Sequence, residues 1–280
     1  VASSQIPCAA GTYQASTGQT SCDATAAGYY SNGTTTVNGV VTNTATSQTA
    51  CAVGTYQAST GQSSCDDAEA GYSVSGTAAT SQTPCAAGTY QASTGQSSCD
   101  DADAGYSVSG TAATSQTACE AGKYQVQTGQ SSCVDTDAGN YSLGTTIVNG
   151  VETGAAIGNI ACGIGTWQNE TGQSSCKDAE AGYYSEGTVG ATGVAVTTIA
   201  SSQIPCAAGT YQGTTAQTSC TDATAGSYSN GTISVNGVMV PATTDTVCGT
   251  GTYQAATGQS SCDDADAGYY VSLTGQTSQA

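Results

Sequence analysis

The chain has 280 residues, enough by length for two ordinary domains, but it contains no Phe, one Trp and one Met beside 37 Gly. This composition cannot supply a large apolar core, so small units must be held together by something other than hydrophobic burial. The net charge of −18, with two Lys and no Arg or His, argues against binding to nucleic acid or to anionic membranes, because both require cations on the protein. No apolar run reaches the roughly 18 residues of a membrane-spanning helix, so we expect no membrane insertion.

A segment with two cysteines recurs seven times, and Cys85–Cys99 is a representative copy. A Gly follows three residues after each first cysteine, and a Tyr or Trp two residues later. The copies divide the chain into repeats 1–50, 51–84, 85–118, 119–161, 162–205, 206–247 and 248–280. Repetition on this scale indicates a tandem array whose modules contact only their neighbours.

The first eight residues match the repeat junction 199–206, so we expect a mature chain or a segment of a longer one, with any signal peptide already removed.

The cysteine spacing predicts one local disulfide in each repeat. The two cysteines of a repeat are always 14 positions apart, whereas the separation from a second cysteine to the next first cysteine varies from 20 to 30. An open connector absorbs such insertions more easily than a closed ring, so the constant segment is the closed one. A disulfide around a loop of this size stabilises the fold by roughly 3 kcal/mol. The predicted pairs are Cys8–Cys22, Cys51–Cys65, Cys85–Cys99, Cys119–Cys133, Cys162–Cys176, Cys206–Cys220 and Cys248–Cys262. So many paired cysteines indicate an oxidising, extracellular compartment.

An acidic turn follows each second cysteine and holds fifteen of the 20 acidic residues. Carboxylates at alternate positions can bind a hard cation such as Ca²⁺. The candidate ligands are Asp100, Asp101, Asp103, Asp263, Asp264 and Asp266. Repeats one and six have a single acid here, Asp23 and Asp222, which favours the alternative that the turn caps backbone N–H groups and provides solubility. No cofactor is otherwise expected.

Repeats one, four, five and six carry an additional stretch. Three of these stretches contain Val-Asn-Gly-Val, at 37–40, 148–151 and 235–238, and Asn-Gly between β-branched residues predicts a tight hairpin turn. Repeat five has a related stretch at 191–196. We expect two-stranded ribbons that project from the module or extend its sheet. No segment has helical periodicity, so short strands and turns are expected throughout.

Aromatic residues form two series, and we expect them to pack on the disulfides or on neighbouring repeats as a minimal core. The series are Tyr13, Tyr56, Tyr90, Tyr124, Trp167, Tyr211 and Tyr253, and then Tyr29, Tyr72, Tyr106, Tyr141, Tyr183, Tyr228 and Tyr269. The segment 85–88 also resembles 102–105, seventeen positions later. This echo predicts a module of two half-turns, of which only one has a disulfide.

The pattern Cys85…Gly88…Tyr90…Cys99 resembles the first submodule of the cysteine-rich repeats of tumour-necrosis-factor-receptor and ephrin-receptor-like extracellular proteins, and the resemblance covers all seven loops. It implies local pairing of the two cysteines and modules that stack into an elongated rod. The family has a further cysteine where this chain has Ala68, Ala102, Ala179 and Ala265, so the second disulfide is absent and receptor function is not carried over. The high identity between copies is more typical of a surface or filament protein.

Asn-x-Ser/Thr sequons predict covalent glycans at Asn32, Asn140, Asn169 and Asn230, unless the motif arises by chance in a chain rich in Ser and Thr.

We do not expect an enzyme. The absence of His, with Lys123 and Lys177 as the only side-chain amines, argues against a catalytic triad, a zinc site or a Schiff base. Sugar stacking on the tyrosines or Trp167 is a further alternative, although their regular spacing favours packing.

The sequence therefore predicts a small disulfide-rich β fold, an elongated tandem array of seven short β/turn modules without helices. The expected function is that of an extracellular or cell-surface structural protein. Neither end resembles a capping repeat, which predicts self-association into a homopolymeric filament by head-to-tail contact. Alternatives are the stalk of a glycan- or ligand-binding adhesin and a calcium-dependent surface-layer component.

Overall fold

The computed structural model of the chain describes residues 5–187, 199–235 and 238–280. These residues form 32 short strands, paired in sixteen two-stranded antiparallel sheets, and contain no helix. The predicted fold class of a disulfide-rich β protein built from short modules is therefore confirmed. None of the described residues belongs to a helix long and apolar enough to cross a membrane.

Each repeat consists of a bridged half, such as 51–67, which contains the disulfide, and an unbridged half, such as 68–84, which reaches to the next first cysteine. Every bridged half forms a hairpin of two strands, each two residues long. The first strand directly follows the conserved Gly, and the second strand lies in the acidic turn. The pairs are β1 (Thr12–Tyr13) with β2 (Asp23–Ala24), β7 (Thr55–Tyr56) with β8 (Asp66–Asp67), β11 (Thr89–Tyr90) with β12 (Asp100–Asp101), β15 (Lys123–Tyr124) with β16 (Val134–Asp135), β21 (Thr166–Trp167) with β22 (Lys177–Asp178), β25 (Thr210–Tyr211) with β26 (Thr221–Asp222), and β31 (Thr252–Tyr253) with β32 (Asp263–Asp264).

Six of the seven unbridged halves form the same kind of hairpin, whereas residues 265–280 contain no strand. The six pairs among the described residues are β3 (Tyr29–Tyr30) with β6 (Thr49–Ala50), β9 (Tyr72–Ser73) with β10 (Thr83–Pro84), β13 (Tyr106–Ser107) with β14 (Thr117–Ala118), β17 (Asn140–Tyr141) with β20 (Ile160–Ala161), β23 (Tyr183–Tyr184) with β24 (Ile204–Pro205), and β27 (Ser227–Tyr228) with β30 (Thr246–Val247). The half-turn echo in the sequence therefore reflects a real structural period of one hairpin per half.

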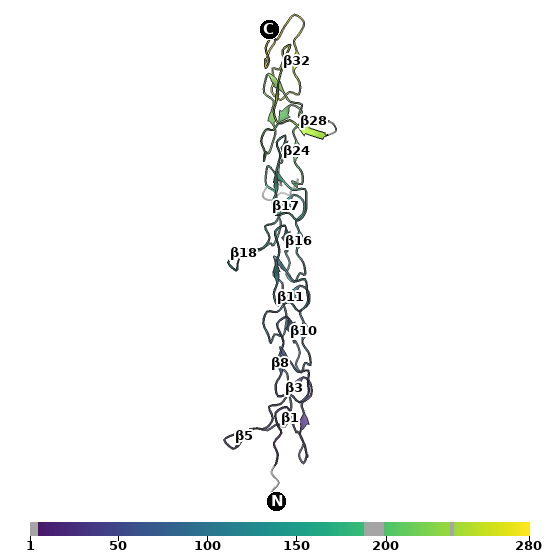
Figure 1. The fold of residues 1–280 in the computed structure, drawn as a ribbon, viewed down its shortest axis with the longest axis vertical. Coiled ribbons are helices and arrows are strands. Elements are labelled where there is room, and N and C mark those ends of the chain that lie inside the picture. The colour runs from purple at the N-terminus through teal and green to yellow at the C-terminus, as the bar shows by residue number, and fades with distance from the viewer. Residues whose placement is uncertain (1–4, 188–198, 236–237) are drawn as a thin grey trace, which may run out of the picture. The chain divides into compact units, whose positions relative to one another are not determined.

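The chain forms two compact units. The first unit consists of Val1–Cys119 and Gln125–Cys133, and the second consists of Glu120–Tyr124 and Val134–Ala280. The division passes through the fourth disulfide loop, so it does not coincide with a boundary between the predicted repeats. The division into seven repeats stays a prediction from the sequence. Within the first unit, β1, β3, β8, β10 and β11 follow one another in chain order (Figure 1).

Successive halves are joined by backbone hydrogen bonds that repeat from step to step. The Gly54 amide donates to the Val74 carbonyl at 2.7 Å, and seventeen residues later the Gly71 amide donates to Gln91 at 2.7 Å. Inside each half, a second bond closes the hairpin, as between the Ala68 amide and the Gly54 carbonyl at 2.8 Å. Because these bonds need only backbone groups, a chain with few apolar side chains can still form ordered contacts between halves.

The Gly three residues after the first cysteine is required by its surroundings. Gly88 has a φ of +90°, and a Cβ built on it would lie 2.2 Å from the carbonyl oxygen of Gly129, two halves further along the chain. Gly71, the equivalent residue of an unbridged half, has a φ of +86° and a corresponding distance of 2.3 Å to Ala112. Any larger side chain would push these halves apart, so the repeated Gly sets the spacing between them.

The buried residues are small or polar rather than aromatic. Six first cysteines are at most 1% exposed, and the alanines at the matching positions of unbridged halves, Ala68, Ala102, Ala179 and Ala223, are 0% exposed. The expectation that the aromatic residues form the core was wrong, while the packing of the rings on disulfides or neighbouring repeats stays a prediction. Trp167 and the tyrosines of both series are half-buried, except Tyr269, which is 57% exposed. The tight spacing between halves leaves room inside for Ala and Cys, and the rings lie at the surface of the hairpins.

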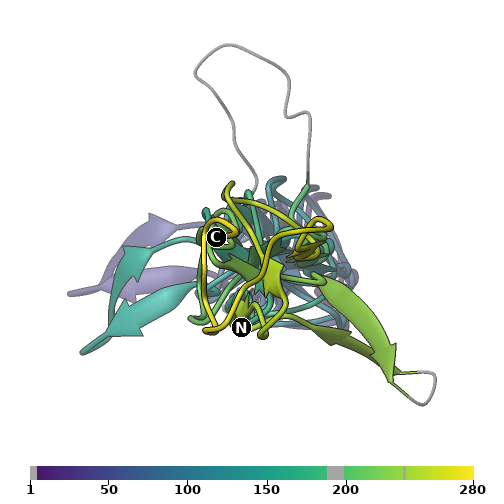
Figure 2. The same ribbon diagram turned by 90° about the horizontal axis from the view of Figure 1, so that it is seen from above.

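The predicted ribbons are present in repeats one, four and six, as β4 (Thr35–Val37) with β5 (Val40–Asn43), β18 (Thr146–Val148) with β19 (Val151–Gly154), and β28 (Thr232–Val235) with β29 (Val238–Pro241). Both turn residues have positive φ in the first two, 51° and 80° at Asn38-Gly39 and 52° and 78° at Asn149-Gly150, as the sequence predicted. The stretch 191–196 and the turn 236–237 lie outside the described residues. All three ribbons project from their units (Figures 1 and 2).

Candidate functional site

The site that the sequence singled out is the disulfide loop. All seven predicted disulfides are present, each between cysteines 14 positions apart, with Cα atoms 5.7 or 5.8 Å apart. These seven bonds pair all fourteen cysteines of the chain. The loop is therefore a closed ring in every repeat, as its constant length indicated.

A glutamine lies inside each ring, six residues after the first cysteine. The Gln57 side chain donates from Nε2 to the Ser64 carbonyl at 3.1 Å, and its Oε1 accepts from the Ser59 amide at 3.0 Å. The same two bonds occur in all seven copies, at Gln14, Gln57, Gln91, Gln125, Gln168, Gln212 and Gln254. The ring is thus filled by one polar side chain that satisfies the backbone on both of its sides.

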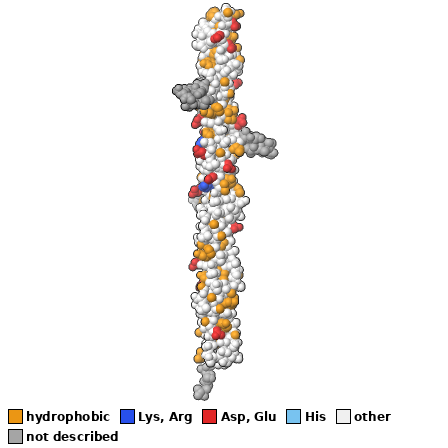
Figure 3. Space-filling model, turned by 90° about the vertical axis from the view of Figure 1, so that its right-hand side faces the viewer, with side chains coloured by type: hydrophobic (Ala, Val, Ile, Leu, Met, Phe, Trp, Pro, Cys, Tyr) orange, Lys and Arg blue, Asp and Glu red, His pale blue; other side chains and the backbone are white. Residues whose placement is uncertain are grey.

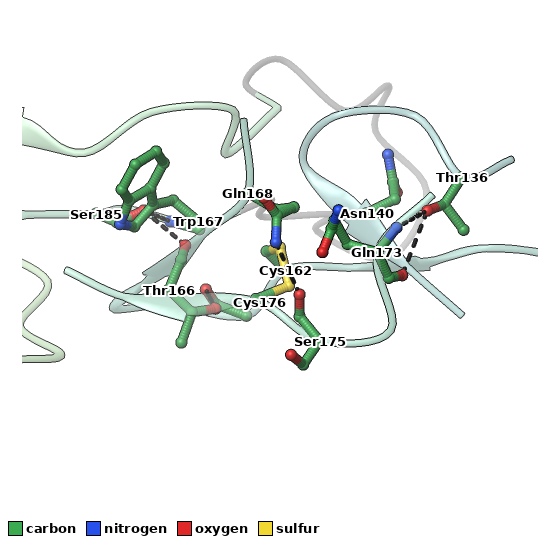
Figure 4. Close-up of a disulfide and its surroundings, with 12 residues drawn as sticks. Thr136, Asn140, Cys162, Thr166, Trp167, Gln168, Gln173, Ser175, Cys176 and Ser185 are labelled. Atoms are coloured by element: carbon green, nitrogen blue, oxygen red, sulfur yellow. Dashed lines mark hydrogen bonds between the residues drawn. A yellow bond between two sulfur atoms is a disulfide. The ribbon is translucent and has the colours of Figure 1, made fainter. Parts of the chain in front are cut away.

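The fifth repeat shows this arrangement most clearly. Gln168 is 2% exposed and lies beside the Cys162–Cys176 disulfide, with its amide pointing towards Ser175 (Figure 4). The bond from Nε2 to the Ser175 carbonyl measures 3.0 Å, and Oε1 accepts from the Glu170 amide at 3.1 Å. Our reading of the sequence did not identify this residue. The signal was its fixed position in all seven copies, which a surface Gln would have no reason to keep.

Unbridged halves use a different closure at the matching positions. Ala68 lies seventeen residues after Cys51, and Gln82 lies seventeen residues after Cys65. The Gln82 Oε1 accepts from the Glu69 amide at 2.7 Å, and its Nε2 donates to the Glu69 carboxylate at 3.1 Å. We call this contact the glutamine clamp. The same bond to a backbone amide is made by Gln48, Gln82, Gln116, Gln203 and Gln279, at 2.6 to 2.7 Å.

Repeat six has Asp245 at the clamp position. Its carboxylate accepts from the Thr224 amide at 3.0 Å and from the Thr224 hydroxyl at 2.7 Å. The bond from the backbone amide, followed by that from the hydroxyl, lowers the pKa of Asp245 below its usual value of 3.8. The ionised acid therefore replaces the neutral Gln as an acceptor for the same backbone group.

The acidic turns, where the sequence predicts Ca²⁺ ligands, contain no preformed cluster of metal ligands in the part of the chain that is described. Among those residues no three Asp, Glu, His or Cys side chains are grouped as metal ligands, and the acids on the face in Figure 3 are scattered. Neighbours in a strand point to opposite faces, which separates Asp100 from Asp101. Asp100 accepts from Gln91 at 3.3 Å and Asp103 from Gln116 at 2.6 Å. Both acids thus accept from glutamine side chains, so these two bonds do not show the predicted capping of backbone N–H groups. Ca²⁺ binding at 100–103, and by Asp263, Asp264 and Asp266, also stays an untested prediction.

The two lysines both form ion pairs. Lys123 contacts Asp135, and Lys177 lies 3.8 Å from a Glu170 carboxylate oxygen. Lys177 also donates to the Asn169 Oδ1 at 2.9 Å, and its Nζ lies 5.4 Å from the centroid of the Trp167 ring. The Lys177 and Glu170 side chains are 45% and 58% exposed, so their ion pair adds little stability.

The four sequons differ in their surroundings. Asn32, Asn169 and Asn230 are exposed. Asn140 is half-buried in β17, and its Nδ2 donates to the Ala138 carbonyl at 3.3 Å. The Ser142 hydroxyl of the same sequon is 2% exposed and bonds to the Lys123 carbonyl at 2.9 Å. The structure therefore leaves room for a glycan at three sequons and little at the fourth.

A scan against models of known protein families finds no match, and a search of curated proteins finds no significant relative. The resemblance to receptor-type cysteine-rich repeats is thus limited to seven modules that each contain one local disulfide. At the positions of the family's further cysteine, Ala68, Ala102 and Ala179 are buried and Ala265 is half-buried.

Gln168→Leu should lower the free energy of unfolding of the fifth repeat by about 2 kcal/mol, because the Ser175 carbonyl and the Glu170 amide lose their buried partner. Fluorescence of Trp167, the single tryptophan, during urea unfolding measures this locally. Gln173→Leu is the matched control, because the Gln173 side chain makes exposed contacts only. Equal effects of the two substitutions would show that the Gln inside the ring is not needed.

Proposed function

We propose that the chain is a structural element of an extracellular fibre, coat or appendage. The observation that carries this proposal is that the contact between successive halves is the same at each step within a unit. The bond from the Gly54 amide to Val74 is repeated by Gly71 to Gln91 and by Gly88 to Val108, each at 2.7 Å. Such a head-to-tail contact has no intrinsic end, and adding copies extends it without a change of geometry.

The internal cross-links suit a protein that bears load outside the cell. Each disulfide closes its loop, so a pull on the chain cannot extend the residues inside the ring. The disulfides also limit the entropy of the unfolded chain, which compensates for the small core. The fourteen paired cysteines support the extracellular location, since reducing compartments do not maintain such bonds.

The seventh repeat presents the surface on which a further half would stack. Gly54, Gly71 and Gly88 are buried beneath later halves, whereas Gly251 and Gly268 are exposed. A Cβ on either of these two would meet no atom within 4 Å. The first two halves of a following repeat, in a longer chain or in a second copy, would cover these two glycines as later halves cover the earlier ones.

Head-to-tail association can be tested by negative-stain electron microscopy and light scattering over rising protein concentration. We expect linear particles that lengthen with concentration. Gly268→Ala should stop this growth, because its Cβ would occupy the space taken by the incoming carbonyl oxygen. Gly249→Ala, at an open site in the same repeat, is the control and should leave growth unchanged. Particles of constant size at every concentration would contradict the filament proposal.

Covalent glycans are the second part of the proposal. Asn32 and Asn230 lie in matching Ser-Asn-Gly-Thr segments at the bases of two ribbons, and both side chains are exposed. Peptide mass spectrometry of the chain from its native source tests occupancy, with modification expected at Asn32 or Asn230. Asn140→Gln should leave the glycan mass unchanged, because Asn140 is half-buried. An intact mass equal to the 27.2 kDa of the sequence would refute glycosylation.

A further inference from the structure

The first ribbon, formed by β4 and β5 over residues 35–43, is one of the uncharged stretches of this acidic chain, as is the third ribbon at 232–241. It contains no charged residue, although the chain carries a net charge of −18. Three of its side chains are exposed valines, Val37 at 57%, Val40 at 65% and Val41 at 54%. It projects from its unit (Figure 2). The ribbon is thus a place where two copies of the chain can meet with little electrostatic repulsion.

The backbone of this ribbon has an open edge. Val37 pairs with Val40 across the Asn38-Gly39 turn, and Thr36 pairs with Val41. In an antiparallel hairpin of this kind the pair at the turn exchanges hydrogen bonds, so the N–H and C=O groups of the next pair point outwards. Thr36 and Val41 also line an open groove of about 450 Å³ at the base of the ribbon.

Proteins normally protect such an edge with a charge, a proline, a bulge or a covering element. The second ribbon has an acid at the position matching Val41, since Glu152 pairs with Ile147 as Val41 pairs with Thr36. The first ribbon has neither a charge nor a proline in residues 35–43. The pairing register shifts between Thr35 and Thr36, which leaves Thr42 as an extra residue of β5, so the regular part of this edge is Val40–Val41. This part of the edge is a suitable template for a further strand.

We propose that the β5 edge of the first ribbon pairs with the β5 edge of the same ribbon in a second copy, forming a four-stranded antiparallel sheet. This proposal rests on the proposed fibre function and supplies its lateral contact. A two-fold axis between identical edges satisfies both sets of backbone groups at once. It also brings the exposed β-branched side chains of the two ribbons side by side, as cross-strand pairs that stabilise a sheet.

A second copy fits this edge better than a cationic partner does. A cationic partner would be attracted to the acidic turns, and the first ribbon offers it no carboxylate. A neutral strand with β-branched side chains is what the edge matches, and the chain itself provides one. Repulsion between the acidic turns then limits association to the ribbon and makes it stronger at high salt, where that repulsion is screened.

Sedimentation velocity tests the proposal on the whole chain at protein concentrations up to about 1 mM, with and without about 0.5 M NaCl to screen charge. The unmodified chain should dimerise, more strongly at high salt. Val41→Lys should weaken dimerisation at least tenfold, because it places a charge at the pairing edge. Val53→Lys is the matched control, since Val53 is 51% exposed but lies in a disulfide loop away from the ribbon, and it should change dimerisation by less than twofold.

Two results would overturn the proposal. A chain that stays monomeric at every salt concentration has no such edge contact, and equal losses with both lysine variants would mean that dimerisation responds only to overall charge. The test is independent of head-to-tail growth. Gly268→Ala should remove linear growth and leave the ribbon dimer, whereas Val41→Lys should remove the dimer and leave linear growth, so that either proposal can fail by itself.

Discussion

The close approach of a carbonyl oxygen to a glycine is the constraint on which the rest of the structure depends. At Gly88 the oxygen of Gly129 lies 2.2 Å from where a Cβ would be, while the Gly88 amide donates to Val108 at 2.7 Å. One residue therefore bonds to the next half and makes room for the half after it. Because the same residue recurs in bridged and unbridged halves, the spacing between halves is the same whichever closure is used.

This spacing explains how a chain with few large apolar residues remains ordered. Tightly spaced halves leave only a narrow interior, in which Cys and Ala are fully buried, as the 0% exposure of Cys51 and Ala68 shows. The remaining volume inside each disulfide ring is taken by a Gln whose amide is fully bonded to the backbone. A polar side chain is tolerated there because both of its hydrogen-bonding ends are satisfied. The glutamine clamp closes the other half without a covalent bond.

The sequence was most informative where geometry allows few alternatives. A constant separation of 14 residues between cysteines predicted the disulfides, and Asn-Gly between valines predicted the turn at Asn38. The echo between 85–88 and 102–105 predicted the half-turns. These features concern backbone conformation and ring closure, which local sequence determines directly.

Tertiary packing was harder to predict. Tyr is a large apolar residue, so its regular spacing indicated a core, yet the interior is too narrow for a ring and the tyrosines lie at the hairpin surfaces. Gln is normally exposed, so Gln168 was not considered for the interior. Its burial depends on two backbone groups that the loop brings together only when folded. The ribbons were predicted as hairpins, but the open edge at Val41 depends on pairing register.

The central claim, that glycine sets the spacing between halves, is tested most directly by Gly165→Ala. A Cβ at Gly165 would lie 2.3 Å from the Ala216 carbonyl oxygen at a φ of +74°, whereas Gly163 has no atom within 4 Å of its Cβ position. Urea unfolding followed by Trp167 fluorescence should show a loss of about 3 kcal/mol for Gly165→Ala and a change below about 0.5 kcal/mol for Gly163→Ala. Equal stability of the two variants would contradict the claim.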